Sequence, residues 1–347
     1  MDHFYSWKTI LITGSTGFKW AWLALWLHSL WARVIGYWLP PNTKPNLFHI
    51  LDLERDITQI YADINDLENL QWVCDEYKPE IVFHLAAQPL VRESYRDPVW
   101  TFQTNVMGTV NVLEVIRKTE SIKWAVLITT DKVYENLETM RPYLETDRLG
   151  GHDPYSTSKA MDELAITSYV RSFFSHGEKK IVSVRAGNVI GGGDWSADRL
   201  IPDIIRAFEK WEPVILRNPD AVRPWQHVLE PLSGYLMMGE KIFSDDRYLG
   251  AYNFGPDISD TMRVEDIMKK AIETLGKGEY RIEPDTTMHE AGLLLLDNTK
   301  SKTLLGWSPH FGIDEAIWMT FEWYRAYEEG VDMRDYSLEE IERFSQE

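Results

Sequence analysis

The sequence has a single cysteine, Cys74, among its 347 residues. One cysteine excludes an intrachain disulfide framework and any multi-cysteine metal or iron–sulfur site. We therefore expect a protein of the reducing cytoplasm without a metal centre. His84 is expected to belong to the sheet, because no HxH or HExxH spacing is present to form a metal site.

An excess of basic charge is also missing. Thirty-six Lys and Arg oppose 54 Asp and Glu, which gives a formal net charge of −18. This balance excludes a basic footprint for polymeric nucleic acid, so any anionic ligand must be held by a local group of basic side chains. Residues 328–347 carry eight acids and two arginines and are expected to form a solvated end without a functional role.

The chain has no long hydrophobic run. Its most apolar run, residues 20–27, is fenced by Lys19 and Arg33 and is far shorter than the roughly 20 residues of a membrane helix. It follows a strand-like segment rather than a basic leader. We expect neither a membrane span nor a signal peptide.

Short apolar runs alternate with amphipathic patterns of helical length in the first half of the chain. The runs predict buried strands at 9–13, 33–37, 81–84, 125–129 and 181–184. The patterns between them predict helices at 18–31, 65–77, 99–118 and 155–174. Parallel neighbours need crossover connections, so this alternation predicts an α/β, doubly wound parallel sheet of the Rossmann type.

Loops rich in Gly, Pro and Asp separate shorter elements after about residue 187, and helices are expected at 228–243, 264–275 and 313–328. We expect a smaller α/β substrate-binding lobe packed on the first, with ligands in the cleft between them. The expected division is a dinucleotide-binding domain at 1–187 with a returning segment near 226–254, a second lobe at 188–225 and 255–330, and an acidic tail at 331–347.

Two glycines, Gly14 and Gly17, lie in the segment TGSTGFK between the first expected strand and the first helix. Backbone N–H groups and a helix N-terminus can approach a pyrophosphate where side chains are missing. A tight turn without a ligand is the alternative. Further features weigh against it: Asp63 and Ile64, Leu85, Ala86 and Ala87, and Asn105 all follow or adjoin the other strands.

Tyr155 and Lys159 form a YxxxK pattern, and Thr130 ends the fifth strand. On a helix this spacing stacks the two side chains on one face. A lysine there can depress the pKa of the tyrosine, which could then accept an alcohol proton during hydride transfer. An exposed helix often shows this pattern by chance.

Segments spread over nearly the whole chain, from residue 13 to about residue 305, give the sequence a specific resemblance. It resembles the extended short-chain dehydrogenase/reductase superfamily and, within it, most closely the CDP-glucose 4,6-dehydratases. The segments that carry the resemblance include HLAAQPLVRESYRDP, TTDKVYEN, GGHDPYSTSKA, RAGNVIGGGDW, RNPDAVRPWQHVLEPLSGY and HEAGLLLLD.

The resemblance implies an NAD-dependent hydro-lyase that converts CDP-D-glucose to CDP-4-keto-6-deoxy-D-glucose for deoxysugar synthesis. It implies catalytic roles for Thr130, Asp131, Lys132, Tyr155 and Lys159. It places the cofactor against Gly14, Thr16, Gly17, Phe18, Lys19, Asp63, Ile64, Leu85, Ala86, Ala87, Asn105, Thr129, Tyr155 and Lys159. It places the sugar nucleotide against Gln88, Asn188, Arg199, Leu200, Arg217, Asn218, Arg223, His227 and His289.

Water elimination needs an acid for the departing C6 hydroxyl and a base for the C5 proton. Asp131 and Lys132 could fill these roles if burial favours their uncharged forms. A surface ion pair at the end of the strand is the alternative. The resemblance also implies a homodimer or homotetramer, paired through the helices at 99–118 and 155–174.

Two tryptophans depart from the family pattern. Trp20 replaces the third fingerprint glycine, and Trp31 replaces the glycine that ends the first helix. We expect the Trp20 indole to swing outward or to invade the cofactor cleft and weaken NAD binding. The second strand ends in GYWLP, with neither the acid that selects NAD nor the arginine that selects NADP. Another nucleotide-sugar epimerase or reductase, or a sugar-nucleotide-binding protein with impaired NAD binding, therefore stays an alternative.

Overall fold

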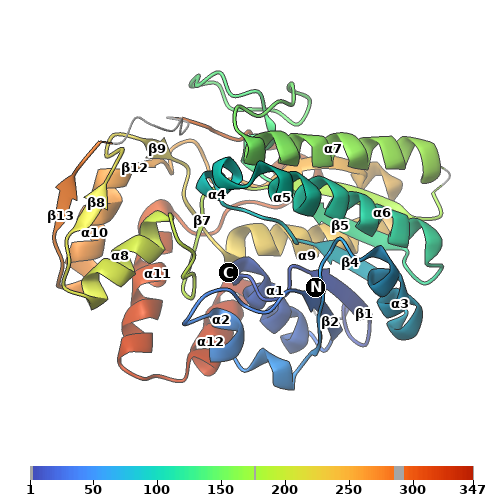
Figure 1. The fold of residues 1–347 in the computed structure, drawn as a ribbon, viewed down its shortest axis with the longest axis horizontal. Coiled ribbons are helices and arrows are strands. Elements are labelled where there is room, and N and C mark those ends of the chain that lie inside the picture. Colours follow the sequence, from blue (N-terminus) through green and yellow to red (C-terminus); the bar gives the residue numbers. More distant parts are fainter. Residues whose placement is uncertain (1–2, 176, 285–292, 347) are drawn as a thin grey trace.

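The computed structural model describes residues 3–175, 177–284 and 293–346 (Figure 1). Its centre is a seven-stranded sheet with the order β11-β6-β5-β4-β1-β2-β3. All of its strand pairs are parallel. The strands are β1 (Thr9–Thr13), β2 (Arg33–Trp38), β3 (Thr58–Tyr61), β4 (Ile81–His84), β5 (Trp124–Ile128), β6 (Lys180–Arg185) and β11 (Gly250–Asn253). The expected doubly wound fold is confirmed.

Helices cover both faces of this sheet, and each face has its own core (Figure 1). On one face lie α3 (Leu67–Tyr77), α6 (Gly108–Lys118) and α7 (Pro154–Phe173). On the other lie α1 (Phe18–Ser29) and α9 (Leu229–Ser244). The central strands are apolar throughout because neither of their faces meets water.

The helix expected at 99–118 is divided. It consists of α5 (Pro98–Phe102), a π-helical turn (Gln103–Met107) and α6. A π turn inserts a residue into the helical ladder and often marks a functional site. Asn105, one of the expected cofactor residues, lies in this turn and is fully buried.

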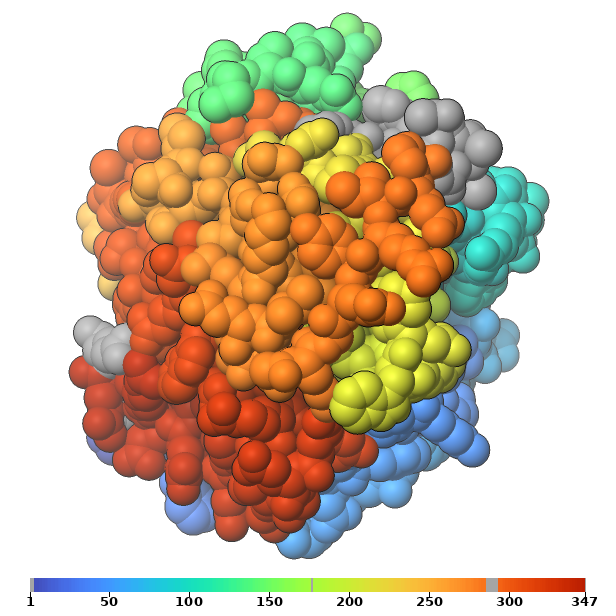
Figure 2. Space-filling model, turned by 90° about the vertical axis from the view of Figure 1, so that its left-hand side faces the viewer, coloured from blue at the N-terminus to red at the C-terminus, as the bar shows by residue number. Residues whose placement is uncertain are grey.

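Shorter elements of the second half pack beside the sheet. They are α8 (Leu200–Glu209), α10 (Val264–Leu275) and α11 (Ile313–Glu328), with the paired strands β7 (Val189–Ile190) and β10 (Gln226–His227), β8 (Val214–Leu216) and β13 (Tyr280–Ile282), and β9 (Val222–Arg223) and β12 (Met262–Arg263). Figure 2 views this side, where the orange and red segments after about residue 250 lie against the yellow segment. Residues of α9 and β11 return to the main sheet, while the proposed division into domains stays a prediction.

The acidic C-terminal segment is not a solvated tail. It forms α12 (Met333–Gln346), an amphipathic helix whose apolar side chains enter the same core as α1. The Phe344 ring lies 5.7 Å from the Trp26 ring, and Arg334 pairs with Asp56. Counting charge alone missed the apolar positions three and four residues apart that bury one face of this helix.

The Trp20 side chain lies in the core, contrary to both expected placements. It is 1% exposed, and its ring centroid lies 5.8 Å from that of Phe48 in α2 (Leu47–Ile50). A ring that entered an open cleft would keep a solvent-exposed side. The indole is instead enclosed by the protein, so the structure does not support a cofactor cleft blocked by Trp20.

Trp31 follows the end of α1 in the left-handed conformation, with φ of 63°. Its N–H donates to His28 O at 2.9 Å, and the Ala32 N–H donates to Leu27 O at 3.0 Å. These two bonds form the Schellman arrangement, in which glycine is the preferred residue. The side chain is 70% exposed, so tryptophan here costs backbone energy without adding to the core.

No helix in the described part of the chain is long and apolar enough to cross a membrane.

Trp20 and Trp31 give opposite predictions for stability. Trp20→Ala should lower the free energy of unfolding by about 3 to 5 kcal/mol, because it leaves a cavity between α1 and α2. Trp31→Gly should raise it by up to about 1 kcal/mol, because glycine adopts a positive φ without strain. Urea unfolding of both variants and of the parent protein measures these changes in the free energy of unfolding. A Trp20→Ala variant as stable as the parent would contradict the core placement.

Candidate active site

The turn after β1 passes very close to the loop after β4. Gly14 has φ of 86°, and a methyl group on it would lie 2.7 Å from Ala86 N. Gly17 is the N-cap of α1, which has neither a capping side chain nor an acid in its first turn. The N-terminus of a 12-residue helix thus presents free N–H groups beside an exposed glycine. These features fit a pyrophosphate.

Basic side chains from distant segments meet beside this turn. Lys19 lies near Tyr235, with its Nζ 3.5 Å from the phenol oxygen. Burial lowers the Lys19 pKa to about 8, with further lowering by the positive charge of Arg199 and a smaller effect of Lys159, while Asp131 opposes the change. A positively charged group of this kind is the local anion site that the acidic composition requires.

Thr130, Asp131 and Lys132 form one cluster at the carboxyl end of β5. The Thr130 hydroxyl donates to Asp131 Oδ1 at 2.8 Å, and Lys132 Nζ lies 3.6 Å from the same oxygen. Asp131 is 1% exposed, whereas the Lys132 side chain is 33% exposed. A surface ion pair, the alternative considered for these residues, would not bury its carboxylate.

Gly187 makes room for Asp131. A methyl group on Gly187 would lie 2.0 Å from Asp131 Oδ2. That oxygen is buried and accepts no hydrogen bond from the described residues. The segment after β6 therefore shapes the pocket of the Asp131 carboxylate, a role that the sequence pattern alone did not reveal.

Tyr155 lies in the first turn of α7 and is 8% exposed. Burial raises its pKa, which a hydrogen bond with Thr130 and the charge of Arg199 lower only in part. Asp131 and Asp153 raise it further. The balance of these effects leaves the Tyr155 pKa above its ordinary value, and the expected partner Thr130 is in place.

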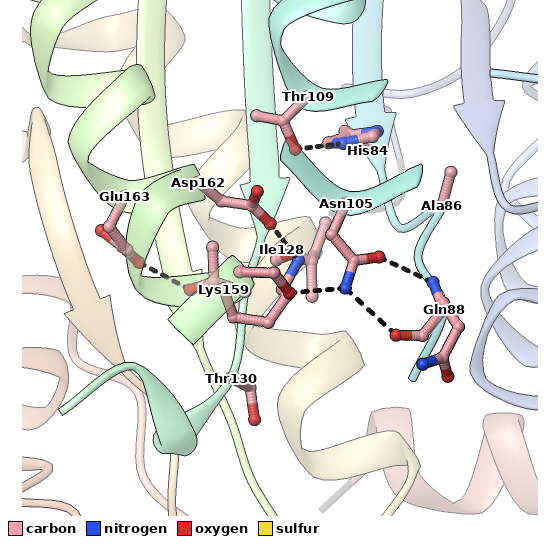
Figure 3. A network of polar contacts seen from close by, with 12 residues as sticks. His84, Ala86, Gln88, Asn105, Thr109, Ile128, Thr130, Lys159, Asp162 and Glu163 are labelled. Atoms are coloured by element: carbon pink, nitrogen blue, oxygen red, sulfur yellow. Dashed lines mark hydrogen bonds and ion pairs between the residues drawn. The ribbon is translucent and has the colours of Figure 1, made fainter. Parts of the chain in front are cut away.

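Lys159 is almost fully buried one helical turn after Tyr155. Its Nζ lies 2.6 Å from Asp162 Oδ2 and donates to Ile128 O at 3.4 Å (Figure 3). Asp162 was not expected at the site. Its position three residues after Lys159 places it on the same face of the helix. This spacing in the sequence could have indicated that Asp162 pairs with Lys159.

Asn105 links α7 to the loop after β4. Its amide group donates to Ser158 Oγ at 2.8 Å and to Gln88 O at 3.1 Å, and it accepts from Gln88 N at 2.7 Å (Figure 3). The Gln88 side chain bonds Thr101 and its own loop. The structure therefore gives Gln88 a role in holding this loop rather than a free amide for a substrate.

The other expected cofactor residues lie at strand ends. Thr16 donates to Leu39 O at 3.0 Å, and Asp63 is exposed after β3, where it accepts from Asn65 N at 2.8 Å. Ile64 is buried against Gly108. The Thr129 hydroxyl donates to Glu163 Oε1 at 2.6 Å and so lies on the side of the buried Glu163–Arg185 pair. The remaining members, Phe18, Leu85 and Ala87, are partly buried.

Expected substrate residues occupy loops around α8. Arg199, directly before α8, pairs with Asp194 at 2.9 Å and acts electrostatically on Tyr155. Arg217 pairs with Asp198 at 3.4 Å. Leu200, Asn218 and Arg223 are exposed or partly buried, and Asn188 has φ of 50° after β6. Among these described residues, Arg199 is the one whose charge acts on Tyr155.

The two histidines expected to bind the substrate, His227 and His289, have different outcomes. His227 is fully buried, with its ring 6.2 Å from Trp22 and 6.0 Å from Phe311, and burial lowers its pKa to about 3. The structure thus encloses His227 in the core and does not place it with the substrate residues. His289 lies outside the described residues.

Comparisons with known proteins agree with this geometry. The family model described as GDP-mannose 4,6 dehydratase matches residues 11–320. The chain is 45% identical to the CDP-glucose 4,6-dehydratase of Salmonella typhimurium, over 98% of this chain and 96% of that protein.

Solved structures share the fold. UDP-glucose 4-epimerase of Thermotoga maritima, solved with UDP-glucose, superposes with a TM-score of 0.81 at 25% identity and covers 92% of this chain and 99% of its own. dTDP-glucose 4,6-dehydratase of Bacillus anthracis, solved with NAD, gives a TM-score of 0.78 at 23% identity, with 93% and 98% covered. With the match across residues 11–320, these findings show that the chain belongs to the GDP-mannose 4,6-dehydratase family of the extended short-chain dehydrogenase/reductase superfamily.

Proposed function

We propose that this chain catalyses the NAD-dependent 4,6-dehydration of CDP-D-glucose to CDP-4-keto-6-deoxy-D-glucose. The observation that carries the proposal is the cluster of Tyr155, Thr130, Asp131 and Lys132 at the carboxyl end of β5. The extensive identity with a curated CDP-glucose 4,6-dehydratase supports CDP-D-glucose as the substrate. The single buried cysteine suits the reducing cytoplasm.

NAD is the cofactor, and the residues present fit it. The uncapped start of α1 suits the pyrophosphate, and Lys159 lies where it can bond a ribose hydroxyl. Bound NAD supplies the oxidant that takes hydride from C4 and returns it to C6. The chain itself must then bind the sugar, move protons and keep water out of the site.

Tyr155 is the proposed base for the O4 proton, and Thr130 orients O4 through the hydrogen bond that it shares with Tyr155. The nearby positive charge of Arg199 favours the phenolate. Once C4 is a ketone, the C5 proton becomes acidic. Lys132 would accept this proton, and Asp131 would protonate the C6 hydroxyl as it leaves as water.

The ion pair of Asp131 and Lys132 holds the right number of protons for these roles. Transfer of one proton from Lys132 to Asp131 would give a neutral acid and a neutral amine without uptake from solvent. The Asp131 carboxylate is buried, which suits an acid in the lining of the pocket. The Lys132 ammonium is partly exposed, which suits a base that faces the ligand.

Incubation with CDP-, dTDP-, UDP- and GDP-glucose in the presence of NAD tests the proposed reaction. We expect a product lighter by one water from CDP-glucose, identified by mass spectrometry. A product of unchanged mass with an inverted hydroxyl would instead indicate an epimerase.

The roles of Lys132 and Tyr155 separate in a single turnover. Lys132→Met should allow oxidation at C4 but block elimination, so enzyme-bound NADH should accumulate. Tyr155→Phe should stop the reaction before NADH appears, because no group remains to accept the O4 proton. Stopped-flow absorbance of NADH measures both. Normal product formation by Lys132→Met would remove Lys132 from the mechanism.

We also propose that the chain forms a homodimer, or a homotetramer built from such dimers, through α5, α6 and α7. Large apolar side chains remain exposed on α5, on the π-helical turn and on α7: Val99, Met107, Met161, Leu164 and Phe173. An exposed apolar surface of this kind on neighbouring helices suits a symmetric contact with a second copy.

A charge at the centre of this surface should separate the copies. Leu164 is 60% exposed, and Leu164→Arg should convert the assembly to monomers. Trp211→Arg is the matched control, because Trp211 is 83% exposed in a different region, before β8. Sedimentation velocity of the three proteins decides the matter, and a monomeric parent protein would contradict the proposal.

A further inference from the structure

The Lys159 ammonium is held by two groups of the protein itself. Its Nζ lies 2.6 Å from Asp162 Oδ2, and both side chains are nearly enclosed, at 3% and 1% exposure. It also donates to Ile128 O at 3.4 Å. An ammonium has three donors, and the contacts with Asp162 and Ile128 do not use all of them.

Asp162 lies beside a buried polar chain. Thr109 acts on its carboxylate and lowers the Asp162 pKa, against the rise caused by burial. Thr109 Oγ1 lies 3.0 Å from His84 Nε2, and His84 Nδ1 lies 2.7 Å from Thr13 Oγ1 (Figure 3). Burial and the Lys159 charge lower the His84 pKa to about 3, so this imidazole is neutral. The carboxylate thus has little freedom to leave the lysine.

Ionisable groups from every surrounding element face this pair or the nearby tyrosine. They are Lys19 of α1, His84 of β4, Asp131 after β5, Asp153 and Glu163 at and within α7, and Arg199 before α8. Glu163 is committed to Arg185, with 2.8 Å between Oε2 and Nη2. Asp162 is therefore the carboxylate that compensates Lys159 directly.

We propose that Asp162 is a positioning residue for Lys159: it fixes the ammonium in one place, compensates its charge, and thereby sets the pH range in which Tyr155 loses its proton. This role rests on the proposed function of Tyr155 as the base. No such role follows from the YxxxK pattern, which contains no acidic residue.

The physical effect follows from the arrangement of charge. A lone ammonium one helical turn from Tyr155 would favour the phenolate, whereas an ammonium paired at 2.6 Å acts as a dipole, whose field falls off faster with distance. Burial raises the Asp162 pKa to about 6, with Lys159 opposing that rise. The carboxylate is therefore ionised above about pH 6, and the pair compensates itself throughout the range in which tyrosines titrate.

Removing only the negative charge tests this inference. Asp162→Asn keeps an oxygen that can accept from Lys159, so the buried amine is not left without a partner. In the ligand-free protein, the phenolate absorbance assigned to Tyr155, obtained by subtracting a matched Tyr155→Phe background, should titrate at lower pH in Asp162→Asn, by on the order of one unit. Asp162→Glu should restore the parent titration.

A matched control is Glu340→Gln, which replaces another buried carboxyl, in α12, and should leave the Tyr155 titration unchanged. Asp162→Ser serves as a second neutral variant, with circular dichroism to verify folding. An unchanged titration in the folded neutral variants would overturn the inference, as would an equal shift in Glu340→Gln.

The same variants are then compared in a single turnover with CDP-glucose and NAD. The acid limb of the rate of NADH formation should move to lower pH in Asp162→Asn and Asp162→Ser. Absence of a product lighter by one water with the parent protein would refute the proposed function, independently of Asp162. Normal turnover by the parent together with an unshifted profile in the variants would refute only the role of Asp162.

Discussion

The site depends on the close approach of Gly14 to the loop after β4. Because a methyl group at Gly14 would lie within 2.7 Å of Ala86 N, only glycine lets the turn after β1 pass this loop. The positive φ of Gly14 turns the chain directly into α1, whose N-terminus then lies at the carboxyl edge of the sheet. Parallel pairing brings the ends of β4, β5 and β6 to that same edge. The residues expected to bind the cofactor and the Tyr155 cluster therefore lie at one edge of the sheet without any long excursion of the chain.

The charge distribution follows from the same arrangement. A chain of net charge −18 would repel a nucleotide diphosphate if its charges were spread evenly. Lys19, Lys159 and Arg199 come from three different elements and act on one another across the site. Two of them have nearby acids, Asp162 and Asp194, which reduce the cost of assembling like charges in a partly buried place. Asp162 and Asp194 thus reduce the electrostatic repulsion among the basic side chains of the site.

Much of the fold could be predicted from the sequence, because the central strands and their helices have strong apolar patterns. β1 and β4 match their expected bounds, and α10 and α11 do so as well. β11 was not predicted as a strand, and a third strand before Asp63 was expected without bounds, since β3 and β11 carry few buried apolar side chains. α12 was hidden by its acidic exposed face. Trp20 was misplaced because a local glycine rule cannot show that α2, nearly 30 residues later, forms a pocket for the indole.

The candidate site was predictable as a set of segments but not as an electrostatic unit. Sequence motifs identify Tyr155 and Lys159, yet they do not show how burial and neighbouring charges balance. Burial and two acids raise the Tyr155 pKa more than Thr130 and Arg199 lower it. A phenol that is neutral at rest will not discharge its proton to solvent before substrate binds. Under the proposed function, the positive charge that favours deprotonation would come from Arg199 and from the bound oxidised cofactor, because Asp162 compensates the charge of Lys159. If Tyr155 is the base, its proton transfer depends on the assembled complex, because the buried Lys159–Asp162 pair carries little net charge by itself.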